Sequence, residues 1–456
     1  MPRIAVVLST GAVVSLLAAC GVKPEAYYQT MRPNLLKSNY QTASDYLEKN
    51  RTKIFSEKDR LLYFMDQGML LHLAKKYKES NGLMESAKKT AEDLWTESIG
   101  ANAAAWVTTD NSLPYQGEDF EKVLLHFVGA LNYIGLADYS AARVEARQVT
   151  AKLELYNSKY VEAKNAYRDD AFTRWLSGRL SETEGGQTAL NDAWIDYKKA
   201  LDVYQTDYMT RYRTAVPRFL VADALRVLQA LGPEFQTELQ QVQSRFPAVP
   251  FKPQAEIQGM GQVVVIHASG EAPYKVDKFW EAKAGPDVLR IAFPEFVAKP
   301  SNIVGARVSL GGVTADTELG ENITAIAFQN LADHMGRIKA KAITRAVTKF
   351  IAAKAAQGAG AKMTQSGNQK TQAAGAVLGI AGAAFEVANA VAEEADKRSW
   401  ITLPAAVNVA ELFVPAGRAD LQVAFVGPGG RPMGSTSIPV EVKAGEIIFV
   451  SLRTFD

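Results

Sequence analysis

The stretch Gly68-Met69-Leu70-Leu71-His72-Leu73-Ala74-Lys75-Lys76-Tyr77 indicates how the first half of this 456-residue chain folds. It is rich in strong helix formers, and Ser80, Met84 and Ala87 follow it at steps of three or four residues. This spacing places the three side chains on one face of a helix, so the sequence predicts two helices that meet at a turn. The same periodicity continues from about Tyr27 to Phe246, which predicts a mainly helical region.

The pattern recurs along this region. It resembles the tetratricopeptide repeat, in which a glycine on the first helix and a tyrosine at the turn precede small, large and small residues on the second helix. The second copy comprises Ala130-Leu131-Asn132-Tyr133, Asp138-Tyr139, Ala142, Ala146 and Val149, and the third comprises Gly185-Gly186, Ala193, Tyr197 and Ala200. A last helical pair is expected from Pro217 to Phe246, with a break at Leu231-Gly232-Pro233.

The small residues of the repeat have a structural consequence. Two helices of a hairpin approach closely only where Ala, Ser or Gly removes bulk, and larger residues then fill the neighbouring groove. One hairpin cannot bury its apolar face alone, so stacked hairpins share a core and form a concave surface. The copies lie about 62 and then about 54 residues apart, which excludes a strict array with a period of about 34 residues. A partner-binding groove and a compact helical domain without a groove both remain open.

The pattern changes after residue 247. Ala248-Val249-Pro250-Phe251-Lys252-Pro253 is a proline-rich linker, and beyond it apolar and polar residues alternate, which is typical of strands. Strands are expected at Gly261–His267, Val288–Ala292, Ala306–Leu310, Ile401–Phe413, Asp420–Val426, Ser437–Val442 and Ile447–Arg453. We therefore predict an α+β fold, with a tetratricopeptide-like α-solenoid at residues 20–247 and a β-sandwich-like C-terminal domain at residues 248–456.

A long helical hairpin at about residues 324–397 is expected to interrupt the strands. Its first helix should run from about Thr324 to Lys354. The apolar face of that helix carries Phe328, Leu331, Met335, Ile338, Ala342, Ala346 and Phe350, and the other face carries Arg337, Lys339, Lys341, Arg345 and Lys349. The basic stripe is either a solvated face or a contact for anionic lipid, lipopolysaccharide or glycan.

Small residues dominate the remainder of the hairpin. Residues Gln357 to Gln372 are rich in Gly, Ala, Ser and Gln and are expected to form a mobile loop. Ala373 to Ala392 is nearly all apolar, and its glycines Gly375, Gly379 and Gly382 permit close contact between helices. We expect this second helix to pack on the first one. Oligomerisation through the Gly375–Gly382 helix, or pore formation, is the alternative.

The single cysteine of the chain lies near its start. Residues 1–19 combine one positive charge with an apolar run from Ile4 to Leu17, as in a secretory signal peptide. Leu17-Ala18-Ala19-Cys20 resembles the lipobox of bacterial lipoproteins, which implies cleavage before Cys20 and acyl chains on that residue. Gly21, in place of Asp, implies sorting to the outer membrane. We therefore expect a lipid-anchored protein that faces the periplasm, and a plain signal peptide is the alternative.

Composition and motifs exclude several classes of function. With Cys20 as its only thiol the chain has no disulfide, and a net charge of +2 gives no reason to expect nucleic acid. The four histidines are scattered over separate elements, so we expect no metal site and no cofactor. Acidic pairs such as Glu118-Asp119 and Asp169-Asp170 are expected on solvated faces. No nucleophile elbow, zinc signature or phosphate loop is present, and we expect a protein that is not an enzyme.

The C-terminal half carries the most specific motif, Asp396-Lys397-Arg398-Ser399-Trp400-Ile401-Thr402-Leu403-Pro404. Together with Gly270-Glu271-Ala272-Pro273-Tyr274-Lys275 and Ile343-Thr344-Arg345, it resembles a poorly characterised family of Gram-negative lipoproteins with tetratricopeptide-like helices. Members of this family are often encoded near lipoproteins that resemble penicillin-binding-protein activators. This resemblance implies a role in the cell envelope.

Two interpretations of this motif remain open. In the structural one, Asp396 and Arg398 lie at a helix end, Arg398 links that helix to the sheet, and Trp400 opens a strand and fills the core. In the other, Lys275, Asp396 and Arg398 line a ligand cleft.

The expected function is a protein-interaction scaffold in envelope biogenesis, including regulation of peptidoglycan synthases. Envelope proteins would bind the tetratricopeptide-like surface, and lipidated Cys20 would bind the membrane. Two alternatives remain: an oligomeric component of an envelope-spanning machine for secretion, motility or fibre export, and an envelope hydrolase.

Overall fold

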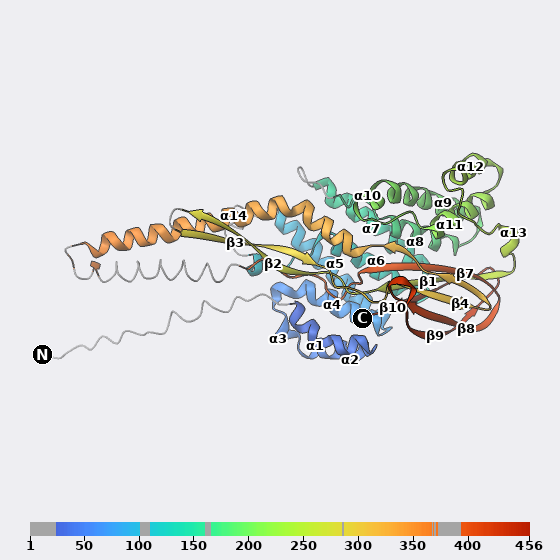
Figure 1. Cartoon of the computed structure of the whole chain (residues 1–456), viewed down its shortest axis with the longest axis horizontal. Coiled ribbons are helices and arrows are strands. Elements are labelled where there is room, and N and C mark those ends of the chain that lie inside the picture. Colours follow the sequence, from blue (N-terminus) through green and yellow to red (C-terminus); the bar gives the residue numbers. More distant parts are fainter. Residues whose placement is uncertain are drawn as a thin grey trace.

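The computed structural model describes residues 24–100, 110–159, 166–284, 287–366, 368, 371–372 and 394–456. Within these ranges the fold is α+β, as expected, with helices in the first half and strands in the second half (Figure 1). The expectations for residues 1–19, for Cys20 and for the Gly375–Gly382 helix lie outside the described residues.

The first half consists of paired helices. They are α1 (Pro24–Leu36), α2 (Tyr40–Lys49), α3 (Arg51–Ile54), α4 (Arg60–Leu73), α5 (Tyr77–Gly100), α6 (Asp119–Gly135), α7 (Tyr139–Lys159), α8 (Ala171–Glu182), α9 (Gly186–Val203), α10 (Met209–Arg211), α11 (Arg218–Leu231) and α12 (Gln236–Arg245). Helix α4 packs with α5, α6 with α7, α8 with α9, and α11 with α12, and each pair also contacts the next pair. The expected helical hairpins are therefore present.

Small residues allow the two helices of a hairpin to approach closely. The hydroxyl of Ser80 in α5 donates a hydrogen bond of 2.7 Å to the carbonyl oxygen of Gly68 in α4. A Cβ atom at Gly68 would lie 2.7 Å from Cε of Met84. In the third hairpin, a Cβ at Gly178 would lie 2.4 Å from the ring of Tyr197. These contacts confirm that Ser80, Met84 and Tyr197 lie at hairpin interfaces.

The second half contains three sheets. Its strands are β1 (Met260–Ser269), β2 (Tyr274–Ala284), β3 (Asp287–Val297), β4 (Gly305–Leu310), β5 (Val313–Asp316), β6 (Glu318–Glu321), β7 (Ala406–Pro415), β8 (Gly417–Val426), β9 (Pro432–Val442) and β10 (Ile447–Arg453). One sheet has the order β10-β1-β7-β6, a second has the order β5-β4-β8-β9, and β2 pairs with β3 alone. Strand β1 runs parallel to β10 and antiparallel to β7. The short helix α13 (Gln254–Ile257) precedes β1.

Strand β1 lies between two layers. Successive side chains of a strand point to opposite faces, and both faces of β1 are buried. Val263 and Val265 pack with apolar residues of the β5-β4-β8-β9 sheet. Val264 and Ile266 belong to the apolar core that the helices form. One continuous core therefore joins the helices to the first sheet, although the secondary structure changes at the expected linker.

Helix α14 (Ile323–Thr364) and the β2–β3 hairpin extend away from this body as an arm (Figure 1). Ala342 and Ala346 of α14 pack on Ile291 and Phe293 of β3. The helix continues to Thr364, so the expectation of a loop from residue 357 is wrong over its first half. Ala, Gln, Lys and Met are good helix formers, and extending an existing helix needs no new nucleus. Among the described residues, no helix has the length and apolar character needed to cross a bilayer.

Candidate functional site

The motif segment, residues 395–405, lies against the helical array. It contains neither helix nor strand, and β7 begins only at Ala406. The expectation that Asp396 and Arg398 end a helix and that Trp400 opens a strand is therefore wrong. Side chains of the helices bind the middle of the segment: the backbone amide of Trp400 donates to Glu121 of α6 at 2.7 Å, and the hydroxyl of Thr402 donates to Asp66 of α4 at 2.8 Å. The ends of the segment bond to strands, since the amide of Ala395 donates to Asp277 of β2 and the amide of Ala405 donates to the carbonyl oxygen of Ser269 in β1.

Arg398 is the centre of this contact. Its Nη1 lies 2.9 Å from Oδ1 of Asp59, and its Nε and Nη2 bind the two carboxylate oxygens of Asp396 at 2.9 and 2.7 Å. Its side chain is 1% exposed, and the guanidinium lies over the ring of Tyr115. Burial by itself raises the pKa of Asp396, but hydrogen bonds and charge from Arg398 outweigh it and lower that pKa. Asp396 is therefore an ionised partner of a buried cation.

Lys275 joins the same cluster from β2. Its Nζ forms an ion pair with Glu118 and donates to the carbonyl oxygen of Arg398 at 3.1 Å. Burial lowers the pKa of Lys275, and the neighbouring carboxylate of Glu118 more than compensates, so the pKa is raised. Trp400 is fully buried, and its indole Nε1 donates to Thr402 at 3.0 Å. The four predicted residues, Lys275, Asp396, Arg398 and Trp400, thus lie together.

The geometry favours the structural interpretation of this cluster. Each charged group is satisfied by partners from elsewhere in the chain, so a ligand would have to displace buried ion pairs. Breaking a buried pair by removing one partner costs about 3–5 kcal/mol. The cluster therefore acts as a clamp, which we call the motif clamp, between residues 395–405 and the helices.

Sequence reasoning missed the partners of the clamp. Asp59 and Glu121 are each the fourth residue of a capping box, which starts at Ser56 and Glu118 respectively. The spacing of these residues in the sequence indicates a helix start. The burial of the two carboxylates, however, could not be predicted from it. Similarly, the acidic pairs expected on solvated faces are partly buried. Asp119 is 3% exposed. Asp170 is fully buried, and its carboxylate caps α8 by accepting a hydrogen bond from the backbone amide of Thr173.

A second buried network links the array to the first sheet. Arg179 of α8 is fully buried and donates to Gln262 of β1 at 2.6 Å, and its Nε lies 3.2 Å from Glu411 of β7. The carboxylate of Glu182 forms ion pairs with both Arg179 and Arg226. Because these charges are inaccessible to solvent, the network serves to connect the layers.

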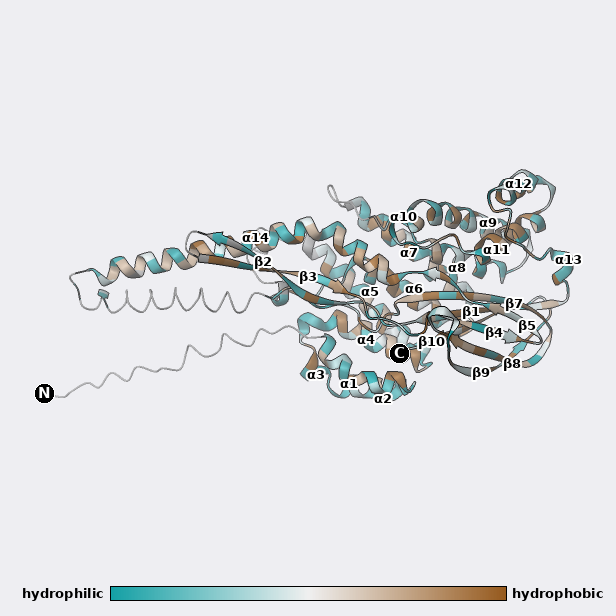
Figure 2. Cartoon of the chain, in the orientation of Figure 1, coloured by the Kyte–Doolittle hydropathy of each residue, from teal (hydrophilic) through white to brown (hydrophobic). Residues whose placement is uncertain are grey.

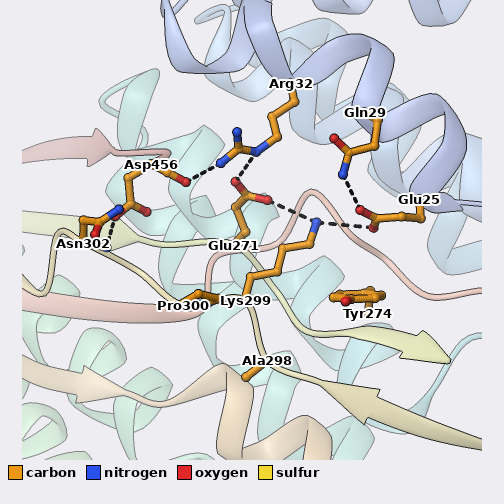
Figure 3. Close-up of a pocket in the computed structure, with 10 residues that line it drawn as sticks. All are labelled: Glu25, Gln29, Arg32, Glu271, Tyr274, Ala298, Lys299, Pro300, Asn302 and Asp456. Atoms are coloured by element: carbon orange, nitrogen blue, oxygen red, sulfur yellow. Dashed lines mark hydrogen bonds and ion pairs between the residues drawn. The ribbon is translucent and has the colours of Figure 1, made fainter.

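An open pocket of about 410 Å³ lies between α1 and the segment after β3 (Figure 3). Its lining consists of Glu25, Gln29, Arg32, Glu271, Tyr274, Ala298, Lys299, Pro300, Asn302 and Asp456. Arg32 Nε donates to Glu271 at 3.0 Å, and Lys299 lies 3.1 Å from the other oxygen of Glu271. The charges of both signs in this pocket are thus paired with one another.

The described histidines have partners from their own surroundings. His72 contacts Asn132 at 2.7 Å, His126 contacts Glu145 at 2.7 Å, and His267 contacts Thr454 at 2.9 Å. Over the part of the chain that the structure covers, no group of three or more His, Cys, Asp or Glu residues could hold a metal ion. No family model, no curated protein and no solved structure matches this chain.

Proposed function

We propose that this chain is an outer-membrane lipoprotein that faces the periplasm and acts as a rigid, non-enzymatic scaffold for envelope proteins. In this proposal a tetratricopeptide-like solenoid and a β-sandwich-like domain form one body, and acylated Cys20 holds that body at the membrane. The observation that carries the proposal is the motif clamp, in which Asp66 of α4, Glu121 of α6 and Asp59, just before α4, bind residues 395–405 of the same chain. Charged groups are used here to make one rigid body out of distant segments.

The clamp also indicates which surface remains for partners. Nearly every residue of α6 and α8 is buried, because the sheet and the motif segment cover the first helices of the hairpins. The second helices are more open. Val144 of α7 and Ile195 of α9 are 58% and 45% exposed. We call this face of α7 and α9 the outer face and propose that it binds envelope proteins, since a rigid surface lowers the ordering cost of binding.

The setting we propose is envelope biogenesis, including regulation of peptidoglycan synthases. The resemblance of the motif to Gram-negative lipoproteins supports this setting, and the lipobox at Cys20 supports the location.

The test is crosslinking in living cells. A photoreactive amino acid at Val144 or Ile195 should capture peptidoglycan synthases or other envelope proteins, and Cys20→Ala should abolish the capture by releasing the protein from the membrane. Ser437, an exposed residue of β9, is the matched control position. Equal capture from Ser437 would contradict a specific outer face, and recovery of the full-length chain from the cytosol would contradict the location.

Two further measurements address the alternatives. The acyl-free protein should release no muropeptides from purified sacculi, and their release would overturn the non-enzymatic assignment. Light scattering should show no large oligomer of defined size. A ring-sized oligomer would instead support a component of an envelope-spanning machine.

A further inference from the structure

Between Ala342 and Ile351, helix α14 exposes bulky apolar residues and buries small ones, whereas Ile323, Ile326 and Leu331 near its start are buried. Ala342 and Ala346 are 3% and 7% exposed where they pack on β3, whereas Ile343, Val347 and Ile351 are 37%, 39% and 61% exposed. The three exposed residues recur every four positions and therefore form one stripe, about 100° around the helix from the buried alanines. A contiguous stripe of exposed bulky apolar residues is typical of a surface that contacts an apolar partner.

The same helix is strongly basic. Between Ile323 and Thr364 it contains seven Lys or Arg residues and one acidic residue, Asp333, so its formal net charge is +6, whereas the whole chain carries +2. Arg337 and Lys339 are exposed one to two turns before Ile343. Figure 2 shows hydrophobic and hydrophilic residues interspersed along this helix.

The β2–β3 hairpin adds aromatic side chains to the arm. Phe279 and Trp280 are 41% and 49% exposed, and Val288 is 56% exposed. The guanidinium of Arg290 lies 3.6 Å from the centre of the Phe279 ring. Trp and Arg or Lys in close proximity are typical of surfaces that lie at a membrane interface.

We infer that the α14 stripe of Ile343, Val347 and Ile351, flanked by Arg337 and Lys339, docks on an anionic phospholipid leaflet. Isoleucine and valine enter the boundary between headgroups and acyl chains, while the cations contact lipid phosphates. Charge complementarity favours this partner, because Arg337 and Lys339 are exposed beside the stripe and would be attracted to lipid phosphates. This contact does not involve the acyl group on Cys20. At about 1.5 Å per residue, the helix is about 60 Å long.

The experiment uses the chain from residue 20 with Cys20→Ser, so that no acyl chain contributes. Sedimentation should show binding to vesicles of phosphatidylethanolamine and phosphatidylglycerol and little binding to phosphatidylcholine vesicles, with a loss of binding at high salt. Changing Ile343, Val347 and Ile351 together to Ser should weaken binding at least about tenfold. Arg337→Gln with Lys339→Gln should weaken it by a similar factor.

The matched control changes three similarly exposed apolar residues outside the arm and the outer face, Leu36, Met209 and Val304, to Ser, and this variant should bind as the parent does. Equal binding to both kinds of vesicle, or undiminished binding by the stripe variant, would overturn the inference. A change in oligomeric state of the stripe variant without a change in vesicle binding would also overturn it and assign the stripe to a second copy. Because acylation is absent from every sample, these outcomes leave the proposal for Cys20 untouched.

Discussion

At the scale of single residues, Asp66 is a carboxyl group whose charge is suppressed by its surroundings. It is fully buried between α1, α4 and the motif segment, where it accepts hydrogen bonds from Tyr27 and Thr402. Burial raises its pKa from 3.8 to about 7, although both hydrogen bonds act in the opposite direction. Asp66 therefore holds a proton in the folded protein at mildly acidic pH.

This state makes the stability of the protein depend on pH. Between the unfolded pKa of 3.8 and the folded pKa of about 7, the unfolded chain has lost a proton that the folded chain retains. The free energy of unfolding consequently falls as pH rises through this window, by up to about 4 kcal/mol. Asp66→Asn does not titrate and can still donate to one partner and accept from the other. We expect it to become progressively more stable than the wild type from about pH 4 to about pH 7.5.

Urea unfolding of both proteins across this pH range measures the effect. Other buried carboxyls with raised pKa away from Asp66, such as Glu321 and Asp170, are present in both proteins, so they cancel in the difference. A difference in unfolding free energy that stays constant with pH would contradict the assignment of the proton to Asp66.

The residues of the motif clamp show what sequence could and could not predict at this scale. Lys275, Asp396, Arg398 and Trp400 stood out because their residue types recur in a recognisable motif. Their partners did not, because one of them, Asp59, which binds Arg398, lies 339 positions earlier in the chain. Only the fold brings such residues together. Because the paired charges are then buried, we assign them a structural role.

At the scale of elements, a glycine sets the separation of the two helices in the third hairpin. A Cβ atom at Gly178 would lie 2.4 Å from Cε1 and 2.7 Å from Cδ1 of Tyr197. Tyr197 is fully buried and bonds to Glu182, so its ring cannot move away. We expect Gly178→Ala to lower the free energy of unfolding by about 2–3 kcal/mol through overpacking, despite the better helix propensity of alanine.

Gly82 in α5 provides the matched control. It is exposed, and a Cβ there would meet nothing within 4 Å. Gly82→Ala should therefore raise the free energy of unfolding, by about 0.5–1 kcal/mol. Thermal or denaturant unfolding of both variants gives the comparison, and a similar effect of the two substitutions would show that the Tyr197 contact does not set the helix separation.

The elements themselves were predictable to different degrees. The helices followed from periodicity and turn residues, because an amphipathic helix carries its signal locally. The strand β2 was missed, since Tyr274–Ala284 contains charged and aromatic residues without clear alternation and pairs only with β3. Residues 401–405 were assigned to a strand because apolar and polar residues alternate from Ile401 to Phe413, yet they form no strand and β7 begins only at Ala406.

At the scale of the whole molecule, the shared core makes the two halves one structure. Val264 and Ile266 of β1 belong to the same apolar cluster as the helices, and Arg179 adds a buried connection to Gln262 and Glu411. By contrast, the linker between the halves is exposed at Ala248 and Pro250. The chain connection there contributes little to stability compared with the interface.

We therefore expect that cutting the linker leaves the molecule intact. With a protease site inserted after Pro250, the cleaved protein should elute from a size-exclusion column at the volume of the uncut protein, and the two pieces should separate only in denaturant. Arg179→Leu removes the cation beside buried Glu411 and one of the two cations that pair with Glu182, so its cleaved pieces should separate at a lower urea concentration. Arg307→Ala, which removes an exposed ion pair with Asp316, should change nothing. Two independently folded pieces that elute apart without denaturant would contradict a shared core and, with it, the rigid body on which the proposed scaffold depends.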